Sequence, residues 1–121
     1  MVIYSWSNIL TELKLDRVTL YEFHAQFCKT LADANRLLII AELVMGEKSV
    51  SDLANSLGLR QSNVSKHLAL MRERGLVVTR RDGASIYYSL SDPRIFQAIE
   101  LLVHVQTDQV ARRHNLSQNI Q

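Results

Sequence analysis

The sequence predicts a mainly α-helical fold with one small β-hairpin, and three observations support this prediction. Apolar residues recur at helical spacing in five stretches of the chain. Between residues 76 and 90 that pattern gives way to β-branched and aromatic residues, interrupted by Asp82-Gly83. Gly58 lies in a short turn between two of the predicted helices, and a short turn that contains glycine makes two successive helices cross steeply. A chain of 121 residues is expected to form a single domain over residues 1–121.

The first predicted helical region covers residues 1–31, as one long helix or two. Its apolar residues form two stripes at helical spacing, namely Ile3, Trp6, Leu10 and Leu13, then Leu20, Phe23, Phe27 and Leu31. Both stripes exceed what a surface helix needs to cover the core of a small domain. We therefore expect part of them, Trp6 and Phe23 especially, to pack against a second subunit. The alternative is that they cover the core of the same chain.

The second predicted helix begins after Asp33, a residue type that favours the N-cap position, and runs to about Met45. Gly46 follows, and glycine commonly ends a helix because it takes left-handed backbone angles without steric cost. This helix is expected to be a core element. The residues predicted to face the core are Leu37, Leu38, Ile40, Ala41 and Val44.

The next two predicted helices are the pair separated by Gly58. The first of them follows Ser49, a good N-cap, and Asp52 places a carboxylate in the first turn, where the helix dipole favours it. Its apolar face comprises Val50, Leu53, Ala54 and Leu57.

The second helix of the pair is predicted over about residues 61–74, with Val64, Leu68 and Met71 on its buried face. A helix turns by about 100° per residue, which fixes the residues of the opposite face. These are Ser62, Ser65, Lys66 and Ala69, with Gln61 and Asn63 at the flanks. A helix that enters the major groove of DNA needs slim side chains and groups that hydrogen-bond to base edges. The alternative is a solvated amphipathic helix.

Residues 76–81 and 84–90 are predicted to form a β-hairpin, or wing, joined by Asp82-Gly83, a dipeptide that matches the twist of the strands. Arg80 and Arg81 then lie at its tip, where they suit a phosphate backbone or a narrow minor groove. The alternative is that they only make the hairpin soluble. Residues 60–81 hold six basic residues and one acidic residue, a net charge of +5 in a chain with a net charge of +2.

The final predicted helix covers residues 92–115, with Ser91 or Asp92 as its N-cap and Pro93 in its first turn. From Arg112 onward the chain is polar and is expected to fray. The helix is expected to pack on the first helical region and on its counterpart in a dimer. Its apolar residues are Ile95, Phe96, Ile99, Leu102, Val103 and Val105. The predicted dimer interface comprises Trp6, Leu20, Phe23, Phe27, Ile99, Leu102 and Val103.

Four blocks carry a resemblance to a known family: residues 31–40 (LADANRLLII), 61–68 (QSNVSKHL), 74–77 (RGLV) and 87–90 (YYSL). Over about residues 20–105 the chain resembles the ArsR/SmtB family of bacterial and archaeal repressors. The resemblance implies a winged helix-turn-helix homodimer that binds a near-palindromic operator in double-stranded DNA. Such proteins are usually released from DNA by a metal or a chemical inducer.

The resemblance also bears on individual residues. It suggests that His67 contacts DNA, and the alternative is a structural hydrogen bond within the fold. Lys66 stands where many relatives have glutamine and can reach a guanine or a phosphate, and Arg60 stands where relatives often have a serine or threonine cap. The predicted DNA-binding residues are Arg60, Gln61, Ser62, Asn63, Ser65, Lys66, His67, Arg80 and Arg81.

The metal-ligand motifs of this family are missing from the sequence. Ser49 and Ser51 stand where arsenic and cadmium/lead sensors carry cysteines, and a hydroxyl does not replace a thiolate for a soft metal. The histidine positions of zinc-sensing relatives fall on Arg94, Val105 and Asp108. We therefore predict no metal site and no cofactor. A weak candidate remains if the first and last helices pack together, and it comprises His24, Cys28 and His104.

Cys28 is the single cysteine, which rules out a disulfide within one chain and fits a reducing cytosol. Redox-responsive relatives use a pair of cysteines, and by this resemblance the position of the first falls on Ala41. Cys28 is then open to single modification, to pairing with its copy in a dimer, or to a structural role as a buried thiol.

These observations predict a cytoplasmic, sequence-specific transcriptional regulator, most simply a repressor. No apolar run approaches the ~20 residues of a membrane span, so no membrane partner is expected. No catalytic constellation is evident, so we predict that the protein is not an enzyme. Two alternatives remain: a winged-helix interaction or dimerisation module without specific DNA binding, and a sensor that uses the Cys28 thiol or an atypical metal site. The sequence identifies no inducer.

Overall fold

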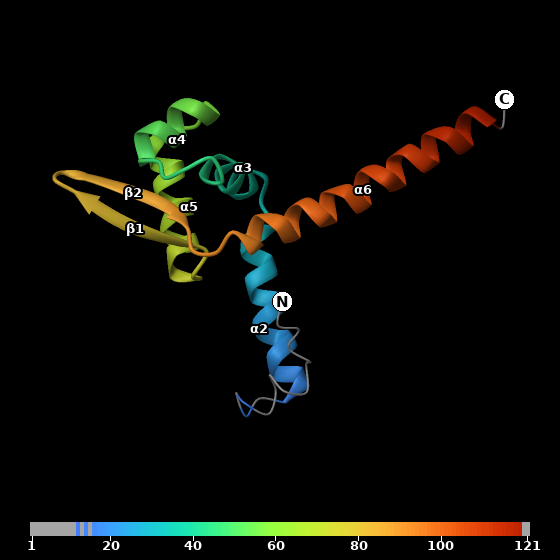
Figure 1. The fold of residues 1–121 in the computed structure, drawn as a ribbon, viewed down its shortest axis with the longest axis horizontal. Coiled ribbons are helices and arrows are strands. Elements are labelled where there is room, and N and C mark those ends of the chain that lie inside the picture. The colour runs from blue at the N-terminus through green and yellow to red at the C-terminus, as the bar shows by residue number, and fades with distance from the viewer. Residues whose placement is uncertain (1–11, 13, 15, 120–121) are drawn as a thin grey trace.

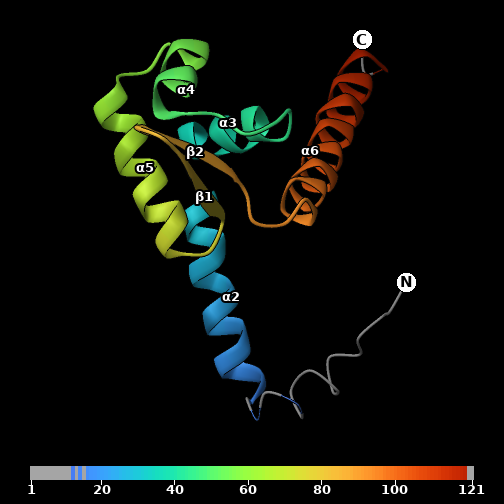
Figure 2. The same ribbon diagram turned by 60° about the vertical axis from the view of Figure 1, so that its left-hand side comes forward.

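A computed structural model describes residues 12, 14 and 16–119. Its elements are α2 (Arg17–Leu31), α3 (Ala34–Leu43), α4 (Val50–Leu57), α5 (Gln61–Glu73), β1 (Val77–Asp82), β2 (Ser85–Leu90) and α6 (Arg94–Asn119). Helices α3, α4 and α5 form a central group beside the hairpin of β1 and β2, while α2 and α6 lead away from it in different directions (Figure 1, Figure 2). The predicted combination of a mainly helical fold with one hairpin is confirmed.

The core lies between the central helices and the base of the hairpin. On α5, the predicted residues Val64, Leu68 and Met71 are all fully buried. Complete burial of an apolar side chain of this size contributes about 1.5–3 kcal/mol. The same cluster contains Ile39, Ile40 and Leu43 of α3, Leu53 and Ala54 of α4, and Leu76 and Val77 after α5.

Helix α4 has the predicted ends. The backbone N–H of Asp52 donates to Ser49 Oγ (3.1 Å), and the backbone N–H of Ser49 donates to Asp52 Oδ2 (3.3 Å). This reciprocal pair satisfies two N–H groups that a helix start otherwise leaves without partners. Gly58 follows the helix with φ +66°, in the left-handed region. Only Leu59 and Arg60 then separate α4 from α5, so a tight turn links the two helices.

The buried face of α3 differs from the prediction. Of the residues predicted to face the core only Ile40 is buried, while Leu38, Ala41 and Val44 are exposed. Leu37 is half-buried. Since nearly every position of α3 is apolar, spacing alone does not select a face. The observed stripe starts at Arg36 and continues through Ile39, Ile40 and Leu43. Arg36 Nε donates to the carbonyl of Thr30 (2.5 Å), so a charged residue begins the stripe that faces inward.

The loop of the hairpin lies one residue later than predicted. Asp82 pairs with Ser85, so the two-residue loop is Gly83-Ala84 and not Asp82-Gly83. Gly83 has φ +61° and Ala84 does not have a positive φ, which are the signs of a type II′ turn. One-residue pairing between Lys48 and Tyr88, through backbone hydrogen bonds of 3.0 and 2.8 Å, fastens the base of the hairpin to the α3–α4 connection.

Helix α2 begins anew within the region predicted as one helix or two. Asp16 caps it by accepting from the N–H of Thr19 (2.7 Å), and Lys14 has φ +52°, so residues 1–31 are not one continuous helix. Phe27 and Leu31 pack against the core, whereas Phe23 is exposed. Trp6 and the other residues of the first predicted stripe lie outside the described residues.

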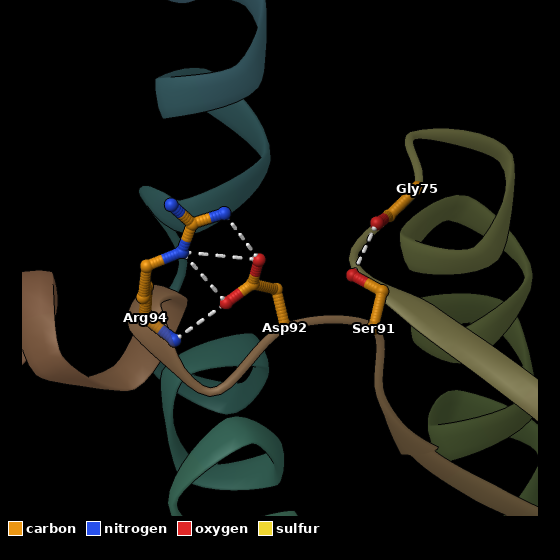
Figure 3. A network of polar contacts seen from close by, with 4 residues as sticks. All are labelled: Gly75, Ser91, Asp92 and Arg94. Carbon is orange, nitrogen blue, oxygen red and sulfur yellow. Dashed lines mark hydrogen bonds and ion pairs between the residues drawn. The ribbon is translucent and has the colours of Figure 1, made fainter. Parts of the chain in front are cut away.

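The connection from the hairpin to α6 is held by polar contacts (Figure 3). Ser91 Oγ donates to the carbonyl of Gly75 (2.6 Å), which ties the end of β2 to the end of α5. The carboxylate of Asp92 accepts from the backbone N–H of Arg94 (2.9 Å) and from its guanidinium Nη2 (2.7 Å). These bonds from Arg94, to the charged form of the carboxyl, lower the pKa of Asp92 to about 2.

Helix α6 departs from two predictions. It continues to Asn119, beyond the predicted end at residue 115. Its first turns pack against the core through Ile95, Phe96 and Ile99, but the rest extends away from α2 (Figure 1, Figure 2). Among the described residues, the predicted packing of the last helix along the first therefore does not occur within one chain.

Within the described residues, no helix combines the length and the apolar character that a membrane span needs.

The contact between Asp92 and Arg94 predicts the titration of this carboxyl. Because the pKa of Asp92 is lowered in the folded state, its contact with Arg94 stabilises the fold at pH values above the ordinary pKa of 3.8. This contribution is lost as the pH falls through about 2. An NMR titration of the Asp92 carboxyl carbon should give a midpoint near 2, and Arg94→Gln should move it up towards 3.8. A wild-type midpoint near 3.8 would contradict the contact.

Candidate nucleic-acid interface

The exposed face of α5 carries most of the predicted DNA-binding residues. Val64 and Leu68 hold one side of this helix in the core, so the residues of the other side stand in solvent. The exposed residues are Gln61, Ser62, Asn63, Ser65, Lys66 and Ala69. All of them are short or polar, and Lys66 adds a positive charge to this face. The structure thus brings together the predicted face.

The N-terminus of α5 is tied to α4 and open to an anion. Gln61 Nε2 donates to Ser51 Oγ (3.2 Å), which links the starts of the two helices. Arg60 occupies the N-cap position, is exposed, and makes no side-chain capping bond. A guanidinium has no acceptor for the free N–H groups of the first turn. Those N–H groups and the Arg60 cation both favour a negatively charged partner, such as a phosphate.

His67 lies at the border of this face and is half-buried. Arg36 Nη1 lies 3.3 Å from His67 Nδ1, and since a guanidinium only donates, the histidine accepts. Arg36 also lies 3.9 Å from Asp33. The backbone N–H of Arg36 donates to Asp33, and this bond is the main reason that the pKa of Asp33 is lowered. The hydrogen bond that the sequence left as the alternative role of His67 is present.

The two wing arginines have different surroundings. Arg80 Nε donates to Glu47 Oε2 (3.0 Å), and its guanidinium lies 5.0 Å from the centre of the Tyr87 ring. The bond lowers the pKa of the Glu47 carboxyl and raises that of Arg80. Arg81 is exposed and takes part in none of the ion pairs found among the described residues. Arg81 is thus the wing cation available to an incoming anion, whereas Arg80 is already paired.

Sequence reasoning missed Glu47 and Tyr87. Tyr87 had a signal, because it is the cross-strand partner of Arg80 in the observed register. Placing the loop one residue early gave Arg80 the neighbour Ser85 instead. Glu47 had no comparable signal, since it lies far from Arg80 in the sequence and outside any regular spacing.

The weak metal candidate does not form within the chain. Cys28 Sγ lies 3.5 Å from His24 Nε2, one turn apart on α2. His104 lies on α6, which extends away from α2, and no group of three potential ligands was found among residues 12, 14 and 16–119. Cys28 is exposed, so its alternative role as a buried thiol is wrong for a single chain.

The predicted dimer-interface residues fall into two groups. Phe27 and Ile99 are half-buried against the core of the same chain, and Leu20 is also half-buried. Phe23 on α2 and Leu102 and Val103 on α6 are exposed.

Comparisons with known proteins show which family and which solved structures this chain resembles. A family model described as bacterial regulatory protein, arsR family, matches residues 33–79. The HTH-type transcriptional regulator Rv0081 of Mycobacterium tuberculosis is 39% identical over 97 residues, which cover 76% of this chain and 85% of the relative. Its crystal structure matches with a TM-score of 0.71 at 36% identity, over 78% of this chain and 95% of that one.

Two further solved structures are similar. The homodimeric winged helix-turn-helix DNA-binding domain Mb0332 from Mycobacterium bovis matches with a TM-score of 0.69 and 27% identity, over 77% of this chain and 89% of that one. The transcriptional repressor BigR from Xylella fastidiosa matches with a TM-score of 0.63 and 32% identity, over 75% of this chain and 96% of that one.

The contact between Arg80 and Glu47 predicts an NMR signature of the wing. The Arg80 Nε–H should give a slowly exchanging signal at neutral pH, because Glu47 holds it. Since the pKa of Glu47 is lowered, the bond should persist above pH 4.5 and break as the pH falls through the lowered value, which the chemical shift of the Arg80 Nε–H reports by moving towards that of a free arginine. Glu47→Gln should weaken it at neutral pH. Asp82→Asn, which removes a carboxylate 3.8 Å from Arg80, should leave it unchanged, and the opposite pattern would refute this pairing.

Proposed function

The chain belongs to the ArsR family of bacterial regulatory proteins and is a DNA-binding transcriptional regulator, and we propose that it acts as a homodimeric repressor on a near-palindromic operator. In this proposal each α5 enters a major groove of the operator. Arg60 and Arg81 contact the phosphate backbone on either side. Three points are proposed: which residues contact the DNA, that the protein is a homodimer, and that it represses transcription.

The observation that carries the proposal is the two-sided character of α5. Its buried residues fix the rotation of the helix, and its exposed residues are Ser62, Ser65 and Lys66 with Gln61 and Asn63 beside them. Serine hydroxyls and the lysine ammonium can hydrogen-bond to base edges, and small side chains allow close approach. Of the nearby cations, Arg60 and Arg81 have no carboxylate partner within the described residues.

The homodimer is supported by apolar side chains that the single chain leaves in water. Phe23 is 67% exposed, Leu102 65% and Val103 46%, although all three are large enough to stabilise a core. Exposed apolar side chains of this size commonly mark an interface between proteins. The similar domain Mb0332 is described as homodimeric, which supports the same arrangement here. The extended α6 then packs against a second copy and not against α2 of its own chain.

Dimerisation and operator binding depend on each other in this proposal. Two α5 helices related by a two-fold axis can enter successive major grooves about 34 Å apart on one face of the duplex. Each neutralised phosphate adds about −0.9 to the slope of log affinity against log salt concentration. One protomer offers few cations for contacts with phosphates, so a single protomer is expected to bind DNA weakly.

Repression is proposed because a DNA-binding protein that occupies a promoter most simply blocks access to it. The similarity to the transcriptional repressor BigR supports this direction. A promoter fusion to a reporter, with and without the regulator gene, measures it: expression should rise when the gene is removed.

Replacing Ser62, Ser65 and Lys66 together by alanine tests the reading face. Loss of a base-edge contact costs about 1–3 kcal/mol, so affinity for DNA from the regulated promoter should fall at least about tenfold. Fluorescence anisotropy with this duplex and a scrambled one measures the effect. Arg112→Gln, on the exposed end of α6, is the matched control and should bind as the wild type does. Unchanged binding by the triple variant would favour an interaction module without specific DNA binding.

Val103→Glu tests the assembly. A buried, unpaired charge in an interface is strongly unfavourable, so this variant should sediment as a monomer where the wild type sediments as a dimer. Its affinity for the operator should fall with it. Val78→Glu places the same charge on the wing at a comparable exposure of 50%, and this variant should remain dimeric. If the Val103→Glu variant still dimerises, the interface does not include this part of α6.

A further inference from the structure

A cavity of about 360 Å³ lies between α2, α3 and the end of α5, apart from the exposed face of α5. This volume is at the low end of the range of about 300–1,000 Å³ for small-molecule sites. Its lining residues are Gln26, Lys29, Thr30, Arg36, Leu70 and Arg74. Three of the six are cations and none is acidic, so the lining itself carries a net positive charge.

The three cations of the cavity are not equally engaged. Arg36 is largely committed to the fold, because it donates to the carbonyls of Thr30 and Lys29 and contacts His67. It also pairs with Asp33, which does not line the cavity. Arg36 is therefore a fixed part of the cavity lining and is not free to bind a ligand.

Lys29 and Arg74 carry the available charge. Neither takes part in any ion pair found within the described residues. Arg74 Nη1 donates to Gln26 Oε1 (2.9 Å), which is a neutral partner, and no carboxylate of the described residues pairs with Arg74. Because Gln26 accepts through its oxygen, its amide nitrogen remains a donor. Donors and positive charge thus approach the cavity from α2 and from the C-terminal end of α5.

We propose that this cavity binds a phosphate group, held by Lys29 and Arg74. A phosphate oxygen accepts several hydrogen bonds at once, and charge-assisted bonds to lysine and arginine are the strongest available to it. Two sources supply this chemistry, a small phosphate-bearing molecule and the backbone of bound DNA. The cavity adjoins Leu70 and Arg74, about 14–20 Å along the helix from Gln61, which favours the small molecule.

A phosphate in this position would bridge two parts of the molecule. Gln26 and Lys29 lie on α2, which carries part of the proposed dimer surface, and Arg74 follows the helix that carries the proposed reading face. Occupancy would therefore connect the dimer surface to α5, a consequence that rests on the proposed function. Binding of the phosphate itself does not depend on that function.

The first arm of the test titrates the full-length protein with inorganic phosphate, without DNA, at constant ionic strength. Amide NMR signals of residues 26–36 and 70–74 should shift along saturable curves. Loss of one charge-assisted bond should weaken binding at least about tenfold in Lys29→Gln and in Arg74→Gln. Arg113→Gln, which removes an exposed cation of α6, should bind phosphate as the wild type does. These results support a small-molecule source.

The second arm measures the affinity of the same variants for a random duplex over a range of salt concentrations. If the phosphate comes from DNA, Lys29→Gln and Arg74→Gln should each reduce the magnitude of the salt slope by about 0.9, and Arg113→Gln should not. This result, with no saturable binding of inorganic phosphate, supports the DNA source. If the protein shows no saturable phosphate binding and the variants show no reduced salt slope, the proposal is overturned. A wild type that binds phosphate but not DNA would refute the proposed function and leave this cavity assignment standing.

Discussion

Burial of Val64, Leu68 and Met71 sets the rotation of α5, and the other features of the molecule depend on that rotation. The three side chains lie at i, i+4 and i+7, so they leave the opposite face of the helix in solvent. The cap at Ser49 and the left-handed Gly58 hold α4 at the required angle to α5. A rotation of α5 by one residue would turn Ser65 towards the core and turn Lys66 away from the centre of the exposed face.

The wing and α6 are tied to this helix pair by polar contacts. Lys48 pairs with Tyr88 at the base of the hairpin, and Ser91 donates to the carbonyl of Gly75 at the end of α5. Glu47 holds Arg80, so the α3–α4 connection determines where the wing stands. The Ser91 and Glu47 contacts are exposed and individually weak, yet they act on orientation more than on total stability. A shift of the wing relative to α5 would change which phosphates Arg81 can reach.

The sequence allowed the helix pair and its reading face to be predicted because several local signals agree there. The N-cap, the glycine, the apolar spacing and the hairpin dipeptide all point to the same arrangement. The prediction failed where local signals were uniform or where partners are distant in sequence. Almost every residue of α3 is apolar, so its buried face depended on Arg36, whose partners lie on α2 and α5. The hairpin loop moved by one residue because Gly83 adopts the first position of a type II′ turn.

The central claim is that two copies of α5 read successive major grooves from one face of the duplex. A hydroxyl-radical footprint of the purified protein on the DNA upstream of its own gene tests this most directly. The account predicts two protected patches on each strand, separated by about one helical turn of 10–10.5 base pairs. A single short patch, or uniform weak protection along the whole fragment at physiological salt, would contradict it.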